Sequence, residues 1–182
     1  MRSIEDMKIC CYITKNDIYD ATEKERYSLG LKGEKTLFCI GINPSTACPN
    51  NYDNTINKLK KIAEENGYDS WIMLNIYPQR ETDPDNLDKE YDKIIHEKNL
   101  QIIDQYIKDG SEILCSWGTL INKRTYLINC LEEIYKLLNK KMNISFFHID
   151  KLTKDGHPRH ILYAETKNGL EVFDLNDYIN KF

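Results

Sequence analysis

Four short, mainly apolar runs constrain the fold of this chain more than any other feature. The runs cover residues 36–40, 71–74, 113–115 and 144–149. An apolar run without polar alternation indicates a strand that is buried on both faces, as in a parallel sheet. Amphipathic helices are predicted between the runs, over residues 56–63, 91–107 and 120–138. We therefore expect an α/β fold, a three-layer α/β/α sandwich with a mostly parallel central sheet.

Weaker sequence patterns predict further strands and a helix near the two ends of the chain. Residues 8–13 and 162–165 are predicted to add edge strands, and residues 176–182 to form a short closing helix. The sequence contains no internal repeat, no low-complexity segment and no linker. A single α/β domain over residues 1–182 is the expected organisation, because one core commonly holds about 100–200 residues.

Charge and composition limit the partners that the chain can take. Lysine and arginine total 25 against 29 aspartate and glutamate, a net charge of −4, so any nucleic-acid contact is expected to be local. The apolar runs are far shorter than the roughly 20 residues of a transmembrane helix, and no secretory signal is evident. The six cysteines include no Cys-x-x-Cys pair. We expect a cytoplasmic protein with reduced thiols and no membrane partner.

The five prolines gather in three loops, each directly after a predicted strand. They are Pro44 and Pro49, Pro78 and Pro84, and Pro158. Proline fixes φ and removes a hydrogen-bond donor, so these loops are expected to be rigid. The carboxyl ends of strands border the ligand crevice in an open α/β sheet. The three loops therefore predict a preformed site at one edge of the sheet, although each loop alone is equally well explained as an ordinary turn.

Each of these loops offers polar groups suited to a small ligand. Glycine lets the backbone approach a ligand closely, and an asparagine before proline presents its amide from an extended backbone. The loop that ends with residues 157–160 crowds ionisable groups together. The candidate binding residues are Gly41, Asn43, Ser45 and Thr46 in the first loop, Asn75, Tyr77 and Arg80 in the second, and His157, Arg159 and His160 in the third.

Taken in order along the chain, the polar blocks resemble the signature blocks of the uncharacterised bacterial and phage family called domain of unknown function 1643 (DUF1643). The blocks are residues 41–47, 53–55, 75–84, 115–118 and 154–163, and Arg26-Tyr27 resembles an upstream element. The Gly-His-Pro-Arg-His block at 156–160 is the most specific of them. The chain departs from the family pattern at Cys48 and Asn54.

A second, more distant resemblance implies a chemical role for some of these residues. Gly41-Ile42-Asn43-Pro44 resembles the first motif of the mismatch-specific branch of the uracil-DNA glycosylase superfamily, and His157-Pro158 resembles its later His-Pro-Ser motif. The resemblance implies a uracil-DNA-glycosylase-like fold. It also implies that Asn43 positions an attacking water and that His157 stabilises the departing base. Arg159 stands where that motif has a serine.

The function that we expect is recognition of a nucleobase, a nucleotide or a local nucleic-acid segment, with N-glycosidic hydrolysis left open. Arg80 and Arg159 are candidates to hold phosphate through paired guanidinium donors. Tyr77 and Trp117 are candidates to stack on a base, but core packing explains both side chains at least as well. The sequence has neither a Walker loop nor a GxGxxG turn, and we expect no cofactor.

Other interpretations compete with this one. One is a non-catalytic module that binds a nucleotide or nucleic acid through the same pocket. The acidic net charge fits this module, or an enzyme that acts on free nucleotides, better than a glycosylase that scans duplex DNA. His157 and His160, with Asp155 nearby, form a loose pattern for a metal-dependent hydrolase, and we expect no metal. A nucleophilic thiol at Cys48 is a weaker alternative. The oligomeric state is left open.

Overall fold

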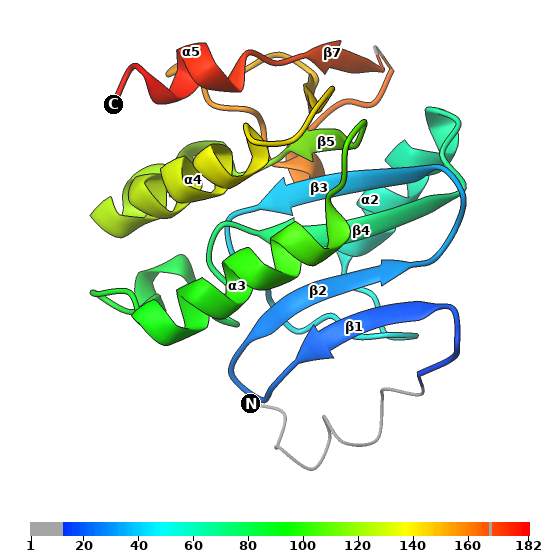
Figure 1. The fold of residues 1–182 in the computed structure, drawn as a ribbon, viewed down its shortest axis with the longest axis horizontal. Coiled ribbons are helices and arrows are strands. Elements are labelled where there is room, and N and C mark those ends of the chain that lie inside the picture. The colour runs from blue at the N-terminus through cyan, green and yellow to red at the C-terminus, as the bar shows by residue number, and fades with distance from the viewer. Residues whose placement is uncertain (1–12, 168) are drawn as a thin grey trace.

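The computed structural model describes residues 13–167 and 169–182, which form an α/β fold around a seven-stranded sheet (Figure 1). Across the sheet, the strands are β1 (Asp17–Ala21), β2 (Arg26–Leu31), β4 (Ser70–Asn75), β3 (Thr36–Gly41), β5 (Glu112–Cys115), β6 (Ser145–Ile149) and β7 (Leu170–Val172). Parallel pairing joins β4, β3, β5 and β6, and antiparallel pairing adds β1 and β2 at one edge and β7 at the other. The sheet is therefore mixed.

The prediction of a mostly parallel sheet is wrong at the two edges. The four apolar runs do form the central strands β3, β4, β5 and β6. Strand β2 gave no such signal, because Arg26, Ser28 and Gly30 interrupt its apolar residues. Close packing requires glycine at position 30, because a Cβ there would clash with the Trp71 carbonyl oxygen of β4.

The edge strand expected at residues 162–165 is also wrong. This segment instead begins with the 3₁₀ turn η3 (Ile161–Tyr163), and the antiparallel edge is formed later by β7. Buried Ile161 fixes this conformation by packing beside α2 (Asn54–Glu65). The strand expected at 8–13 falls almost wholly outside the described residues. The closing helix is confirmed as α5 (Leu175–Ile179).

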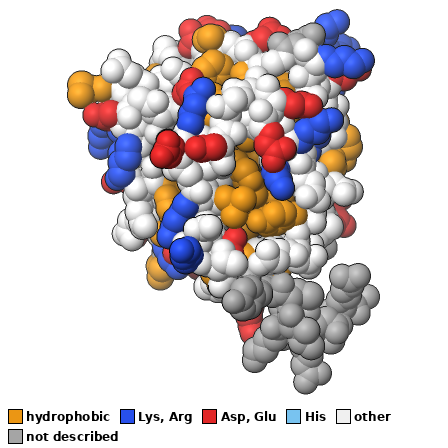
Figure 2. All heavy atoms as spheres, turned by 90° about the vertical axis from the view of Figure 1, so that its right-hand side faces the viewer, with side chains coloured by type: hydrophobic (Ala, Val, Ile, Leu, Met, Phe, Trp, Pro, Cys, Tyr) orange, Lys and Arg blue, Asp and Glu red, His pale blue; other side chains and the backbone are white. Residues whose placement is uncertain are grey.

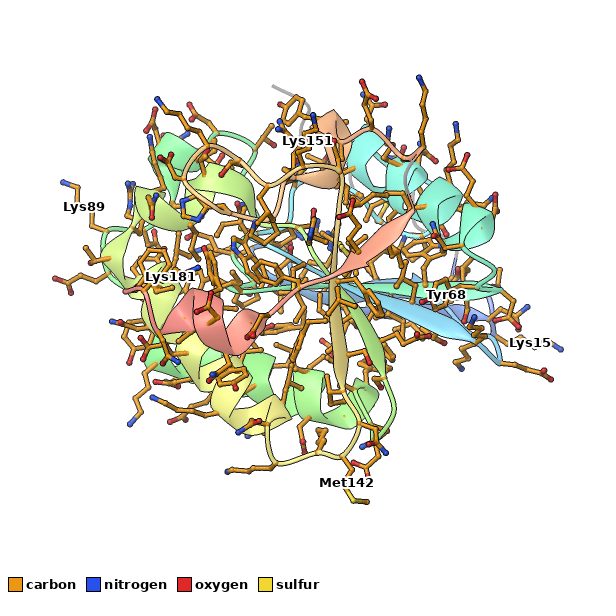
Figure 3. All side chains as sticks on the ribbon, turned by 90° about the horizontal axis from the view of Figure 1, so that it is seen from above. Lys15, Tyr68, Lys89, Met142, Lys151 and Lys181 are labelled. Atoms are coloured by element: carbon orange, nitrogen blue, oxygen red, sulfur yellow. The ribbon has the colours of Figure 1, made fainter. Side chains whose placement is uncertain are left out.

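Helices lie on both faces of the sheet, as Figures 1 and 3 show: α2 on one face, and α3 (Lys93–Tyr106) and α4 (Thr125–Leu138) on the other. The side chains of β3 show why both faces of the sheet are covered. Leu37 and Cys39 belong to the core that α2 covers, whereas Phe38 and Ile40 belong to the core under α3, α4 and α5. Burial of each such side chain stabilises the fold by about 1.5–3 kcal/mol, which is why the run is apolar at consecutive positions.

The surface carries charges of both signs. Figure 2 shows lysine and arginine interspersed with aspartate and glutamate on the face seen from the right of Figure 1. Among the described residues, no helix combines the length and apolar character needed to cross a membrane.

Candidate functional site

A cleft of about 880 Å³ lies at the carboxyl ends of the parallel strands. The loops that follow β3, β4, β5 and β6 all contribute to it, together with the first turn of α2. Its polar lining residues, apart from the aromatic ones, are Arg26, Asn43, Ser45, Asp53, Asn54, Thr55, Glu81, Thr82, Thr119, Thr153, Lys154, Arg159 and His160. Convergence of these loops on one edge follows from the parallel order of the central strands.

The cleft has a buried floor and an open rim. Ile42, Ile56, Met73 and Trp117 line the floor and are almost completely buried. Arg26 is the charged residue among these buried lining groups, with 2% of its surface exposed. The rim includes Tyr163, which has 75% of its surface exposed to solvent.

Asn43 joins the first two loops and still offers an acceptor to the cleft. Its side-chain nitrogen donates to the carbonyl oxygens of Glu81 at 2.8 Å, Pro44 at 3.2 Å and Gln79 at 3.4 Å. No described residue donates to its side-chain oxygen. The amide is therefore held in one orientation by its nitrogen, which leaves Oδ1 able to accept a hydrogen bond from a ligand or a water.

The third loop is attached to the end of β5 by two backbone groups. Ile161 N donates to Ser116 Oγ at 2.9 Å, and Gly118 N donates to the Pro158 carbonyl at 2.9 Å. Gly118 has φ +60°, a conformation that favours glycine. A Cβ at Gly118 would lie 3.4 Å from the Cβ of His160, so the glycine also allows the two loops to approach closely.

Arg159 lies at the rim of the cleft, and one of its three guanidinium nitrogens interacts with other residues of the protein. Its Nε donates to the Lys151 carbonyl at 3.2 Å and lies 3.3 Å from Asp150 Oδ2. Figure 3 places Lys151 on the side of the sheet that carries α2. No described residue accepts from the two terminal nitrogens of Arg159. The bonds at Nε orient a planar fork whose free donors suit a phosphate or carboxylate.

His160 is the histidine of the cleft. Burial lowers its pKa, and the nearby Asp53 carboxylate opposes that shift. Its Nδ1 accepts from Leu162 N at 3.3 Å, so the neutral ring carries its proton on Nε2 and acts there as a donor. The ring packs 5.9 Å from that of Tyr163, which gives the rim a pair of neighbouring aromatic rings.

His157 lies away from the cleft lining. It is 2% exposed, and its Nδ1 lies 2.8 Å from the Tyr178 hydroxyl of α5. Asn122 Nδ2 donates to its Nε2 at 3.1 Å, so the ring carries its proton on Nδ1 and donates it to Tyr178. Both ring nitrogens are thus used inside the fold. Burial lowers the pKa of His157, with Asp155 opposing.

The two histidines of the proposed metal pair therefore have different surroundings. His157 meets Tyr178 on α5, whereas His160 meets the cleft and Asp53. Within residues 13–167 and 169–182, no three histidine, cysteine, aspartate or glutamate side chains gather as metal ligands.

The candidates of the second loop lie behind the cleft lining. Tyr77 is fully buried, its ring 5.1 Å from that of Tyr126, and its hydroxyl accepts from Asp92 N at 2.7 Å. Arg80 donates to the Ser45 carbonyl at 2.8 Å and to the Tyr19 hydroxyl at 2.6 Å. These side chains hold the loops that shape the cleft.

The remaining candidates divide between the lining and its support. Ser45 lines the cleft and shares a 2.8 Å hydrogen bond with Thr82, while exposed Thr46 is outside the lining. Gly41 and Asn75 pair in register on β3 and β4, and a Cβ at Gly41 would meet the side chain of Met73, which lines the cleft. Both side-chain polar atoms of buried Asn75 are without a partner in the described part of the chain.

Several residues that line this cleft were not among the candidates from the sequence, and some of them carry a charge or an aromatic ring. Arg26 reaches it from β2, Asp53 from the cap of α2 and Tyr163 from η3. No local pattern indicated that Arg26 is buried, because β2 does not differ in pattern from a loop. Asp53 was signalled by its position before an amphipathic stripe, which is typical of a helix cap.

The structure is that of an α/β protein with a largely polar cleft at the carboxyl ends of the parallel strands of a mixed sheet. The chain also matches the family described as protein of unknown function (DUF1643) over residues 26–162, and it belongs to this family. No curated protein and no solved structure matches it.

Proposed function

We propose that the cleft binds a nucleotide or nucleobase. One observation carries the proposal: the free acceptor of Asn43, the free guanidinium nitrogens of Arg159 and the ring of Tyr163 all line the same cleft. A nucleotide presents a hydrogen-bonding base edge, an anionic phosphate and an aromatic face. The volume of about 880 Å³ lies within the usual range for small-molecule sites.

Each part of the nucleotide has a matching group. Asn43 Oδ1 accepts from an N–H of the base edge, and His160 Nε2 donates to a base carbonyl. Exposed Tyr163 provides a stacking surface, an interaction worth about 1–3 kcal/mol per base. Arg159 offers its terminal nitrogens to a phosphate.

The distribution of charge favours a small ligand or a short single-stranded segment over a duplex. The protein has a net charge of −4, and Asp53 and Glu81 line the same cleft as the cations. Affinity for duplex DNA rests mainly on many phosphate contacts by lysine and arginine. A cleft with a few cations beside carboxylates suits recognition of one or two nucleotides.

Hydrolysis of an N-glycosidic bond is the second candidate. It rests on the likeness of residues 41–44 to the first uracil-DNA glycosylase motif, and a three-layer fold of that type belongs to the same proposal. Asn43 would orient the water, and its amide is too weak a base to deprotonate it. His160 rather than His157 would donate to the departing base, because only His160 lines the cleft.

The binding proposal is tested by calorimetric titration with the common nucleoside monophosphates. We expect Tyr163→Ala and Arg159→Gln each to weaken binding about tenfold or more, because stacking and charge-assisted hydrogen bonds contribute on that scale. Lys140→Ala is the matched control, since Lys140 is exposed just beyond α4 and outside the cleft lining. Absence of binding to every nucleotide would contradict the proposal.

The catalytic alternative needs a separate measurement. Release of free base from nucleotides and from uracil-containing single strands is followed by chromatography for the wild type and for Asn43→Ala. Base release that the variant lacks supports hydrolysis. Binding without release in both proteins supports a non-catalytic module.

A further inference from the structure

Arg26 is a buried cation without an ion-pair partner in the described part of the chain. Its Nη1 donates to the Ala47 carbonyl at 3.1 Å, whereas its Nε is buried without a partner. Within residues 13–167 and 169–182, no group accepts from Nη2 and no carboxylate forms an ion pair with the guanidinium. Asp53 is the opposing charge nearby and lies beyond ion-pair distance, while Arg80 adds a second positive charge.

This arrangement is costly unless something compensates for it. Burial, followed by the positive charge of Arg80, lowers the pKa of Arg26 to about 10, so the guanidinium remains charged at neutral pH. Buried charges in proteins are normally paired with an opposite charge or fully hydrogen-bonded. The Nε and Nη2 groups of Arg26 are therefore two buried donors that lack the anionic acceptor with which a buried arginine is normally paired.

We propose that Arg26 forms an oxyanion site at the floor of the cleft and that this site takes a terminal phosphate group. The guanidinium edge formed by Nε and Nη2 offers two parallel donors, the geometry that a phosphate accepts in a bidentate manner. Arg26 is 2% exposed and lines the cleft together with the buried side chains of Ile42, Ile56 and Trp117, and an interaction between charges is stronger in such apolar surroundings than in water.

The depth of the site selects among phosphate ligands. Arg159 is partly exposed and accessible to a phosphate within a strand, whereas only 2% of the surface of Arg26 is exposed. A phosphodiester inside a strand carries a nucleotide on each side, and such a group does not fit an enclosed floor. The ligand class is therefore a small phosphate monoester, which under the proposed function is a free nucleotide.

Titration with inorganic phosphate tests this site without any assumption about the rest of the ligand. Binding is measured by calorimetry at constant ionic strength, with chloride as the competing anion. We expect the wild type to bind phosphate and Arg26→Met to bind it at least about tenfold more weakly. Arg26→Lys keeps the charge but loses the paired donors, and we expect an intermediate affinity.

Arg124→Met is the matched control. Arg124 is another partly buried arginine, but its guanidinium donates to the carbonyls of Asp85, Leu87, Asp88 and Lys123, and it is outside the cleft lining. We expect Arg124→Met to lower the melting temperature and to leave phosphate affinity within about twofold. We expect Arg26→Met without ligand to melt at or above the wild-type temperature, because it removes an unpaired buried charge.

Three outcomes would overturn the site: a wild type that does not bind phosphate, an Arg26→Met variant that binds as tightly as the wild type, or an Arg124→Met variant with an equal loss. A wild type that binds phosphate through Arg26 but no nucleotide would leave this site standing and contradict the proposed function. The two proposals are thus separated by one series of titrations.

Discussion

The imidazole Nδ1 of His157 lies 2.8 Å from the hydroxyl oxygen of Tyr178, and this hydrogen bond attaches the loop after β6 to helix α5. Trp117 Nε1 donates to the same hydroxyl at 3.1 Å. Three residues further along the loop, His160 faces the cleft instead. One short block thus supplies a structural histidine and a cleft histidine.

Tyr178→Phe separates the structural role from the binding role. Loss of the hydroxyl leaves buried donors of His157 and Trp117 without an acceptor, which costs about 1–3 kcal/mol in the free energy of unfolding. We expect that loss in urea denaturation, with nucleotide affinity unchanged. Tyr135→Phe, which removes an exposed hydroxyl bonded to Asn176, should cost less. An unchanged stability in Tyr178→Phe would contradict this role.

Stability should depend on pH through the two histidines. Burial lowers the pKa of His157 and of His160 below the ordinary value of 6.5. As the pH falls through that value, the unfolded chain takes up protons that the folded protein does not, so stability is full above pH 6.5 and falls below it. We expect the melting temperature to drop on acidification from about pH 7.5 to about pH 5, and His157→Asn to show a shallower drop. If the melting temperature of His157→Asn fell with pH as steeply as that of the wild type, the role of His157 in the pH dependence would be contradicted.

Asn43→Ala should loosen the contact between the first two loops. The substitution removes the amide that donates to Glu81 and Gln79, and it leaves those partly buried carbonyls without a donor. We expect a loss of about 1–2 kcal/mol in the free energy of unfolding and faster amide exchange in both loops. Ser45→Ala, which removes only the hydrogen bond to exposed Thr82, is the comparison and should change exchange less. Equal rates of amide exchange in Asn43→Ala and the wild type would contradict the role of Asn43 in holding the two loops together.

Gly118→Ala tests whether the close approach of two loops shapes the cleft. An alanine at φ +60° costs about 1 kcal/mol, and its Cβ would come into van der Waals contact with the side chain of His160. Gly156→Ala is the matched control, because Gly156 also has positive φ but a Cβ there would meet nothing within 4 Å. We expect similar losses of stability in the two variants and weaker nucleotide binding only in Gly118→Ala. Equal binding by both variants would contradict the prediction.

The central part of the fold could be predicted from the sequence because of where its side chains lie. Strand β3 is covered by α2 on one face and by the other helices on the opposite face, so every position from Leu37 to Ile40 is apolar. The edge strands lack that signal. Strand β7 has two exposed residues among three, and β2 carries Arg26 and Gly30, so neither differs in pattern from a loop.

The position of the cleft could be predicted, but the direction of individual side chains could not. Prolines after successive strands indicated the edge of the sheet at which the cleft lies. Whether a side chain enters the cleft depends on its partners, and those partners are distant in sequence. His157 is held by Tyr178, and Arg80 by Tyr19, at separations that no local pattern records.

Titration of ¹⁵N-labelled protein with a nucleoside monophosphate, followed through the backbone amide resonances, tests the central claim most directly. We predict saturable shifts concentrated in the loops that line the cleft, at residues 42–45, 53–56, 117–120 and 153–163. Shifts confined to the separate hollow beside β7 and α5, around Phe146, Val172 and Asn176, or the absence of any saturable shift, would contradict it.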